Sequence, residues 1–90
     1  MDSASNFEFR RPQAIADGPV RVAWVDERGQ VRCMPGWCID VSARRIHLEV
    51  PQQVPLHTQV TLSAGRKSIP GPNRVKYLTK CDSKFILVLE

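Results

Sequence analysis

Hydrophobic and polar residues alternate in short runs along most of the chain. The runs cover residues 20–24, 30–34, 37–42, 46–50, 58–64, 75–79 and 85–89. A period of two places alternate side chains on opposite faces of a β-strand, so each run predicts a strand with one buried face. β-Branched and aromatic residues are frequent in the runs, which favours strands, and no window has a convincing helical period. We therefore predict an all-β domain.

Glycine- and proline-containing segments separate the predicted strands. Residues 26–29 predict a hairpin turn in which Gly29 supplies a positive φ at little cost. Pro35-Gly36 should break or bulge a strand, and residues 65–73 predict a long turn. Short strands at intervals of about ten residues indicate a sandwich or a barrel, and closing a few strands into a barrel removes their exposed edges. The residues expected to face inward are Val22, Trp24, Trp37, Ile39, Val41, Ile46, Leu48, Val60, Leu62 and Val75.

The N-terminal residues differ from the rest. Residues 1–9 are polar with two phenylalanines and no period, so we expect a disordered leader. Residues 10–90 form the predicted domain, with Arg10 and Arg11 on a strap before the first strand. No apolar run approaches the length of about 18 residues that a membrane helix needs, and the start lacks the regions of a secretory signal. We expect a cytoplasmic protein that does not engage a membrane.

The composition fits one soluble globular domain, with 90 residues of which 42% are hydrophobic and 24% charged. The net charge of +4 is unevenly distributed: residues 1–50 hold seven acidic and seven basic residues, whereas residues 51–90 hold two and six. A basic surplus attracts polyanions, but on a small domain it equally marks a solvated surface. A single-stranded nucleic acid is not the expected partner, because only Tyr77 lies among basic residues.

The reactive side chains do not form a catalytic or metal-binding set. Cys33, Cys38 and Cys81 are odd in number and lack zinc-knuckle spacing, so free thiols without metal are expected. His47 occupies an outward strand position with no evident partner, and neither a nucleophile–base set nor a glycine-rich phosphate loop is present. We therefore expect neither an enzyme nor a bound cofactor.

Two polar residues stand out at the end of the third run. If Trp37, Ile39 and Val41 face inward, Asp40 and Ser42 share the outer face of the strand. A carboxylate accepts two N–H donors at once and can therefore read the Watson–Crick edge of a guanine. The alternative is structural, because residues of these types also cap turns at strand ends.

The chain resembles the bacterial PilZ domain over about residues 10–89. Arg10-Arg11 is similar to the start of the family's Arg-x-x-x-Arg linker motif, and Asp40-Val41-Ser42 matches its Asp-x-Ser element. Residues 46–50, 54–62 and 74–77 resemble the segments that follow in the family. The resemblance implies a six-stranded antiparallel β-barrel that binds the second messenger cyclic di-GMP. It further implies that Arg10 or Arg11 holds a phosphate or stacks on a base, while Asp40 and Ser42 read a guanine.

The binding motif is incomplete. Ala14 and Ile15 stand where the family has the second arginine of the linker, and Arg45 replaces the final glycine of Asp-x-Ser-x-x-Gly. The missing arginine removes a bidentate, stacking cation, whereas Arg44 and Arg45 are placed either to clash with the ligand or to contact its phosphate. We therefore predict a receptor module that binds cyclic di-GMP weakly. The alternative is a degenerate domain that does not bind the nucleotide and acts through contacts with a protein effector.

Overall fold

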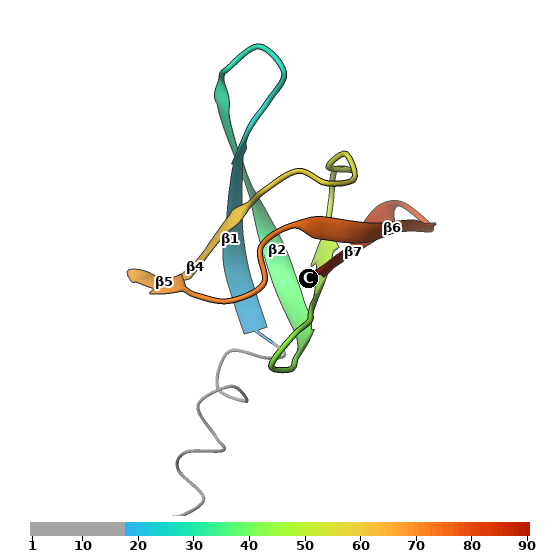
Figure 1. Ribbon diagram of the computed structural model, residues 1–90. Helices are drawn as coiled ribbons and strands as arrows, with labels where there is room; N and C mark the ends of the chain where they lie inside the picture. The colour runs from blue at the N-terminus through green and yellow to red at the C-terminus, as the bar shows by residue number, and fades with distance from the viewer. Residues whose placement is uncertain (1–17) are drawn as a thin grey trace, which may run out of the picture.

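The computed structural model describes residues 18–90, which form one antiparallel sheet without a helix (Figure 1). The strands are β1 (Gly18–Val25), β2 (Val31–Val41), β3 (Ile46–Val50), β4 (Thr61–Ala64), β5 (Lys67–Ile69), β6 (Val75–Cys81) and β7 (Lys84–Leu89). Their order across the sheet is β5-β4-β1-β2-β3-β7-β6. The all-β prediction is confirmed for these residues, none of which forms a helix that could cross a membrane. The predicted leader and the arginines of the strap lie outside the described residues.

The turn between β1 and β2 is held by Asp26. Its Oδ1 accepts hydrogen bonds from the backbone N–H groups of Arg28 and Gln30, each at 2.9 Å. Gly29 donates to the Asp26 carbonyl at 3.0 Å with a φ of 80°, a conformation that glycine adopts without side-chain strain. The hydrogen bond from Gln30 is the main cause that lowers the pKa of Asp26, and Arg28 and Arg32 act in the same direction. The predicted hairpin turn is confirmed.

The sheet curls but does not close into the expected six-stranded barrel. Gly65 and Arg66 form a two-residue turn that returns the chain as β5, inside the segment predicted to be a long turn. β5 pairs with β4 from Leu62 to Ala64, on the side of β4 that β1 leaves free. The edge strands of the sheet are therefore β5 and β6, and no strand ladder joins them, so the barrel is open among the described residues.

The two ends of the curled sheet approach each other where the segment before β4 meets the start of β6. An isolated antiparallel bridge joins Gln59 to Arg74, and the Val60 N–H donates to the Asn73 carbonyl at 2.7 Å. Val75, the first residue of β6, also exchanges backbone hydrogen bonds with the segment before β4: it donates to the Thr58 carbonyl at 2.9 Å and accepts from the His57 N–H at 2.7 Å. The contact bends the sheet around its core without making a continuous ladder.

β2 is one continuous strand of eleven residues, so the predicted break at Pro35-Gly36 does not occur. Proline has no N–H to donate to a neighbouring strand. Pro35 is nevertheless accommodated, because β3 pairs with β2 only from Trp37 onward and β1 alone flanks the strand at the proline. The strand therefore extends past a residue that normally marks its end.

The inner face of β2 is the opposite of the predicted one. Met34 and Cys38 are buried, and Gly36 lies between them. A Cβ atom on Gly36 would lie 3.1 Å from a valine side chain of β3, so the backbone itself packs against the core at this point. Trp37 and Ile39 consequently face outward and are 43% and 44% exposed. The prediction that these two residues are inward-facing was wrong.

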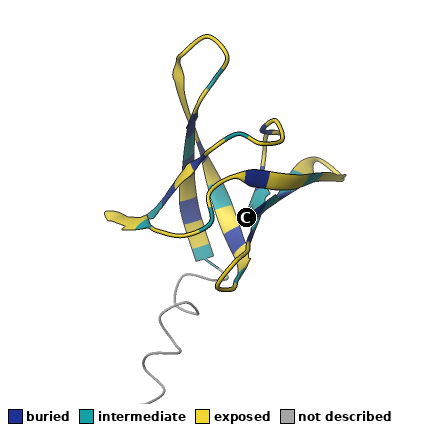
Figure 2. Cartoon of the chain, in the orientation of Figure 1, coloured by how far each residue is buried: buried dark blue, intermediate teal, exposed yellow. Residues whose placement is uncertain are grey.

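The core fills the concave side of the sheet. Its buried residues are Val20, Val22, Trp24, Met34, Cys38, Ile46, Leu48, Val50, Val54, Val60, Leu62, Val75, Leu87 and Leu89. Every residue predicted to face inward is among them except Trp37, Ile39 and Val41, and Val41 is half-buried against the cluster. Exposed residues gather at the tip of the β1–β2 hairpin (Figure 2). The alternating pattern therefore identified most of the core.

Candidate functional site

The link between β2 and β3 is a tight turn over residues 42–45. The Ser42 N–H donates to the Arg45 carbonyl at 2.8 Å, and the Ser42 hydroxyl donates to the same oxygen at 3.3 Å. The hydroxyl therefore helps to close the turn, which is the structural role that the sequence left open. Because its one proton is used there, Ser42 in this arrangement can only accept a hydrogen bond from a ligand.

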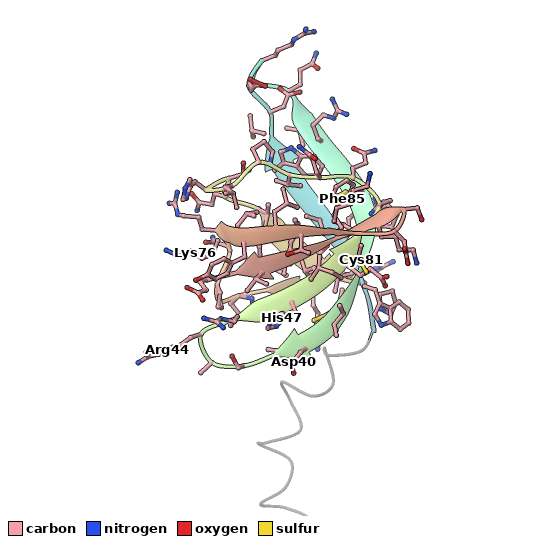
Figure 3. All side chains as sticks on the ribbon, turned by 90° about the vertical axis from the view of Figure 1, so that its right-hand side faces the viewer. Asp40, Arg44, His47, Lys76, Cys81 and Phe85 are labelled. Carbon is pink, nitrogen blue, oxygen red and sulfur yellow. The ribbon has the colours of Figure 1, made fainter. Side chains whose placement is uncertain are left out.

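Asp40 lies at the end of β2 on a β-bulge. Cys38 pairs with Leu48 and Asp40 pairs with His47, so Ile39 has no partner of its own. Both Ile39 and Asp40 are exposed, and Figure 3 shows Asp40 beside the β2–β3 turn. Among residues 18–90, no hydrogen bond or ion pair engages the Asp40 carboxylate. It is therefore available to two N–H donors at once.

The two arginines of the turn have different surroundings. Arg45 forms an ion pair with Glu90, and its guanidinium carbon lies 6.0 Å from the centroid of the Tyr77 ring, within range of cation–π attraction. These contacts direct Arg45 toward β7 and β6, on the far side of β3 from Asp40. Arg44 is exposed and projects from the turn (Figure 3). Arg44 is therefore the cation of the turn that remains available to a ligand.

The two arginines predicted on the strap, Arg10 and Arg11, lie outside the described residues. The first described residue, Gly18, pairs with Cys38, two positions before Asp40. The described part of the chain therefore begins next to the end of β2 that carries Asp40.

The outer face of β2, β3, β7 and β6 carries apolar side chains. Strand register aligns Asp40, His47, Val88 and Tyr77 in one row across it and Trp37, Glu49, Ile86 and Thr79 in the next. We call these eight residues, with Ile39, the outer face. Tyr77 is 51% exposed, while Ile86 and Val88 are half-buried. The solvated face of an antiparallel sheet is ordinarily polar, so a face on which five of nine residues are apolar is a candidate binding surface.

Sequence reasoning missed the outer face for a specific reason. Trp37 and Ile39 were assigned to the core, and His47 was taken for an isolated surface residue. The residues of the face come from two hairpins, β2–β3 and β6–β7, that are distant from each other in the sequence. The strong signal available was the nearly continuous apolar character of β7, because a strand with one solvated face should alternate. That signal indicates a covered second face without saying what covers it.

His47 lies in the middle of the outer face and is half-buried (Figure 3). Its Nδ1 atom is buried, and no hydrogen-bond partner for that atom exists among the described residues. A buried polar atom without a partner costs about 1–3 kcal/mol of stability. His47 therefore lowers the stability of the fold, whereas an apolar residue at this position would leave no buried atom without a partner.

Replacing His47 with phenylalanine is expected to raise the free energy of unfolding by about 1 kcal/mol. The phenyl ring keeps the apolar contacts, favours a strand and has no unsatisfied nitrogen. Urea denaturation followed by tryptophan fluorescence measures the change. His47→Gln is the matched control, since it retains a polar group and should not stabilise the fold. A His47→Phe protein no more stable than the wild type would show that Nδ1 is satisfied in solution.

Other reactive groups in the described region are dispersed. Within residues 18–90, no three histidine, cysteine, aspartate or glutamate side chains gather where they could hold a metal ion. Cys33 and Cys81 are exposed free thiols, and Cys38 is buried, where burial raises its pKa. Two hollows of about 520 and 670 Å³ flank Trp24, and neither is lined by Asp40. None of these features adds a residue to the β2–β3 turn.

The structure brings four of the predicted ligand residues, Asp40, Ser42, Arg44 and Arg45, onto one strand end and its turn. It adds the outer face, which begins at Asp40. Comparisons with protein-family models, with curated proteins and with solved structures found no match. The turn and the outer face are therefore the observations that bear on function.

Proposed function

We propose that this protein is a PilZ-type regulatory module that binds cyclic di-GMP weakly and without catalysis. The observation that carries the proposal is the Asp40 carboxylate, which is exposed and has no partner among residues 18–90 at the strand end next to the start of β1. Guanine presents two adjacent N–H donors on its Watson–Crick edge, and one carboxylate can accept both. A rigid strand end holds that carboxylate in a fixed orientation.

Cations near Asp40 suit a ligand that carries two phosphates. Arg44 is exposed in the turn, and by the PilZ resemblance Arg10 and Arg11 belong to the linker that leads into β1, whose first residue pairs next to the same end of β2. Hydrogen bonds from guanidinium to phosphate are short, charge-assisted and often bidentate. The proposed site therefore combines one unpaired carboxylate, which can accept hydrogen bonds from guanine, with guanidinium groups that can donate hydrogen bonds to phosphate.

Two features support weak rather than tight binding. Ala14 and Ile15 occupy the position of the second linker arginine, and the guanidinium of Arg45 is already engaged by Glu90 and Tyr77. The loss of one charge-assisted contact removes about 1.5–3 kcal/mol. Such a loss lowers the affinity by about one to two decades.

A second candidate function is contact with a protein effector without the nucleotide. The outer face favours it, because exposed aromatic and aliphatic side chains such as those of Ile39 and Tyr77 are enriched at protein interfaces. The use of the Ser42 hydroxyl inside the turn is compatible with this reading. Both candidate functions are proposed for a cytoplasmic protein.

Isothermal titration of the folded protein with cyclic di-GMP tests the first proposal. We expect measurable but weak binding, and a further loss of about one to two decades in Asp40→Asn, because the amide oxygen cannot accept two N–H donors with a negative charge. Glu27→Gln is the matched control. It makes the same isosteric change at an exposed acid in the β1–β2 turn, and its affinity should equal that of the wild type.

The outcomes separate the two candidate functions. GTP serves as the control ligand, since it supplies a guanine and phosphates without the cyclic dinucleotide framework. A folded wild-type protein that gives no heat with cyclic di-GMP at millimolar concentration would contradict nucleotide binding. The protein-contact function would then become the leading candidate.

A further inference from the structure

The proposed ligand has two guanines, and the Asp40 carboxylate accounts for one of them. The outer face extends from Asp40 through His47 and Val88 to Tyr77, which are successive partners on β2, β3, β7 and β6. Neighbouring strands lie about 4.8 Å apart, so the row spans about 14 Å. It is a continuous floor that begins at the carboxylate and ends at an aromatic ring.

The side chains along this floor are suited to a flat apolar ligand surface. Tyr77 is 51% exposed and Ile39 44%, and His47 and Val88 are half-buried between them. The ring of Tyr77 is accessible at the end of the row, where Arg45 lies against it. Aromatic rings on the outer face of a sheet are the platforms on which proteins stack nucleobases.

Charge around the outer face favours an anion with one hydrogen-bonding edge. Of the three acids that border it, Glu49 pairs with Lys84 at 3.6 Å and Glu90 pairs with Arg45, which leaves Asp40 as the acid of this set without an ion pair. Figure 3 shows two exposed cations along one edge of the face: Arg44 projects from the β2–β3 turn beside Asp40, and Lys76 projects from β6 next in sequence to Tyr77. This distribution matches phosphates held along that edge and a base edge held at Asp40.

We propose that the outer face seats the second purine base of the bound nucleotide, stacked on Tyr77 over a floor of His47 and Val88, with Lys76 and Arg44 contacting phosphate. This inference rests on the nucleotide binding proposed above and extends the site from the β2–β3 turn to β6. It also gives Tyr77, Lys76 and His47 a role in binding the ligand. A dinucleotide fits the surface better than a protein segment, because one unpaired carboxylate can read a base edge while Arg44 beside it and Lys76 beside Tyr77 supply a cation for each of two phosphates.

Titrations of single variants with cyclic di-GMP test this placement. Tyr77→Val keeps a strand-forming residue but removes the ring, and is expected to weaken binding about 5- to 100-fold. Tyr77→Phe keeps the ring and should bind within about twofold of the wild type. Lys76→Ala is expected to weaken binding about threefold, whereas Lys67→Ala, which removes the same charge from β5, should leave the affinity unchanged.

Nuclear magnetic resonance of the same titration reports where the second base lies. We expect the Tyr77 ring protons and the amides of β6 and β7 to shift in the wild type together with those of residues 40–45. Tyr77→Val must retain the dispersion of a folded spectrum. Its loss of affinity then reflects the missing ring rather than unfolding.

Each result has a distinct meaning. Binding that needs Asp40 but is unchanged in Tyr77→Val, with no shift at β6, would overturn the placement of the second base and leave the proposed function standing. No binding of cyclic di-GMP by the folded wild type would overturn the proposed function and this inference with it. Binding of a short single-stranded oligonucleotide, but not of cyclic di-GMP, would assign the same surface to nucleic acid and would overturn the dinucleotide.

Discussion

Leu48→Ala in the centre of β3 is expected to lower the free energy of unfolding by about 2–5 kcal/mol. Leu48 is fully buried and lies between its strand partners, Cys38 on β2 and Leu87 on β7, which are also buried. Truncation therefore removes apolar contacts in the middle of the core and leaves a cavity. Domains of this size have a total stability of about 5–15 kcal/mol, so a large part of it would be lost.

Urea denaturation monitored by circular dichroism measures this effect, and Glu49→Ala is its control on the same strand. Glu49 points to the outer face, and its ion pair with Lys84 is partly exposed at 3.6 Å, so its removal should cost no more than about 1 kcal/mol. Equal destabilisation by the two variants would contradict the assignment of the inner and outer faces of β3.

Restoring the incomplete motif with Ala14→Arg and Arg45→Gly is expected to tighten cyclic di-GMP binding by about one to two decades. The new arginine supplies the missing charge-assisted contact. The glycine removes the side chain that pairs with Glu90 and lies against Tyr77, which exposes more of the Tyr77 ring. Isothermal titration of the double variant beside the wild type measures the gain.

Two further variants make this result interpretable. Arg45→Gly alone separates the contribution of the turn from that of residue 14, and its thermal unfolding shows whether the lost ion pair matters for stability, which should change by less than about 1 kcal/mol. Adding Asp40→Ala to the double variant should abolish the gain. A folded double variant that binds no better than the wild type would exclude this surface as a messenger site. The protein-contact function would then take precedence.

Local sequence was enough to identify the class of the fold. The period-two alternation predicted the strands because a strand's two faces follow directly from its backbone geometry. Asp26 and Gly29 predicted the first turn because their hydrogen bonds and φ angle depend on neighbours no more than four residues away. Leu48 and Val22 were placed correctly in the core on the same grounds.

The direction of the β2 faces depended on tertiary structure. In β2 the inward set includes Met34, Gly36 and Cys38, whereas the outward set includes Trp37 and Ile39. Hydrophobicity alone therefore favours the wrong face. Gly36 faces inward because core side chains pack against its backbone, and the bulge at Ile39 shifts the alternation before Val41. Neither effect is visible without the strands that pair with β2.

Closure of the barrel and the extent of the site were also decided by long-range contacts. The chain turns at Gly65 and adds β5 as an edge strand beside β4, and no ladder joins β5 to β6 at the other edge. The sequence placed Asp40 at a strand end, which local alternation determines. The hydrogen bond of Ser42 is local, since its partner is three residues away. The partners of Arg45, and the row that joins Asp40 to Tyr77, exist because the β2–β3 and β6–β7 hairpins, which are distant in the sequence, meet in one register.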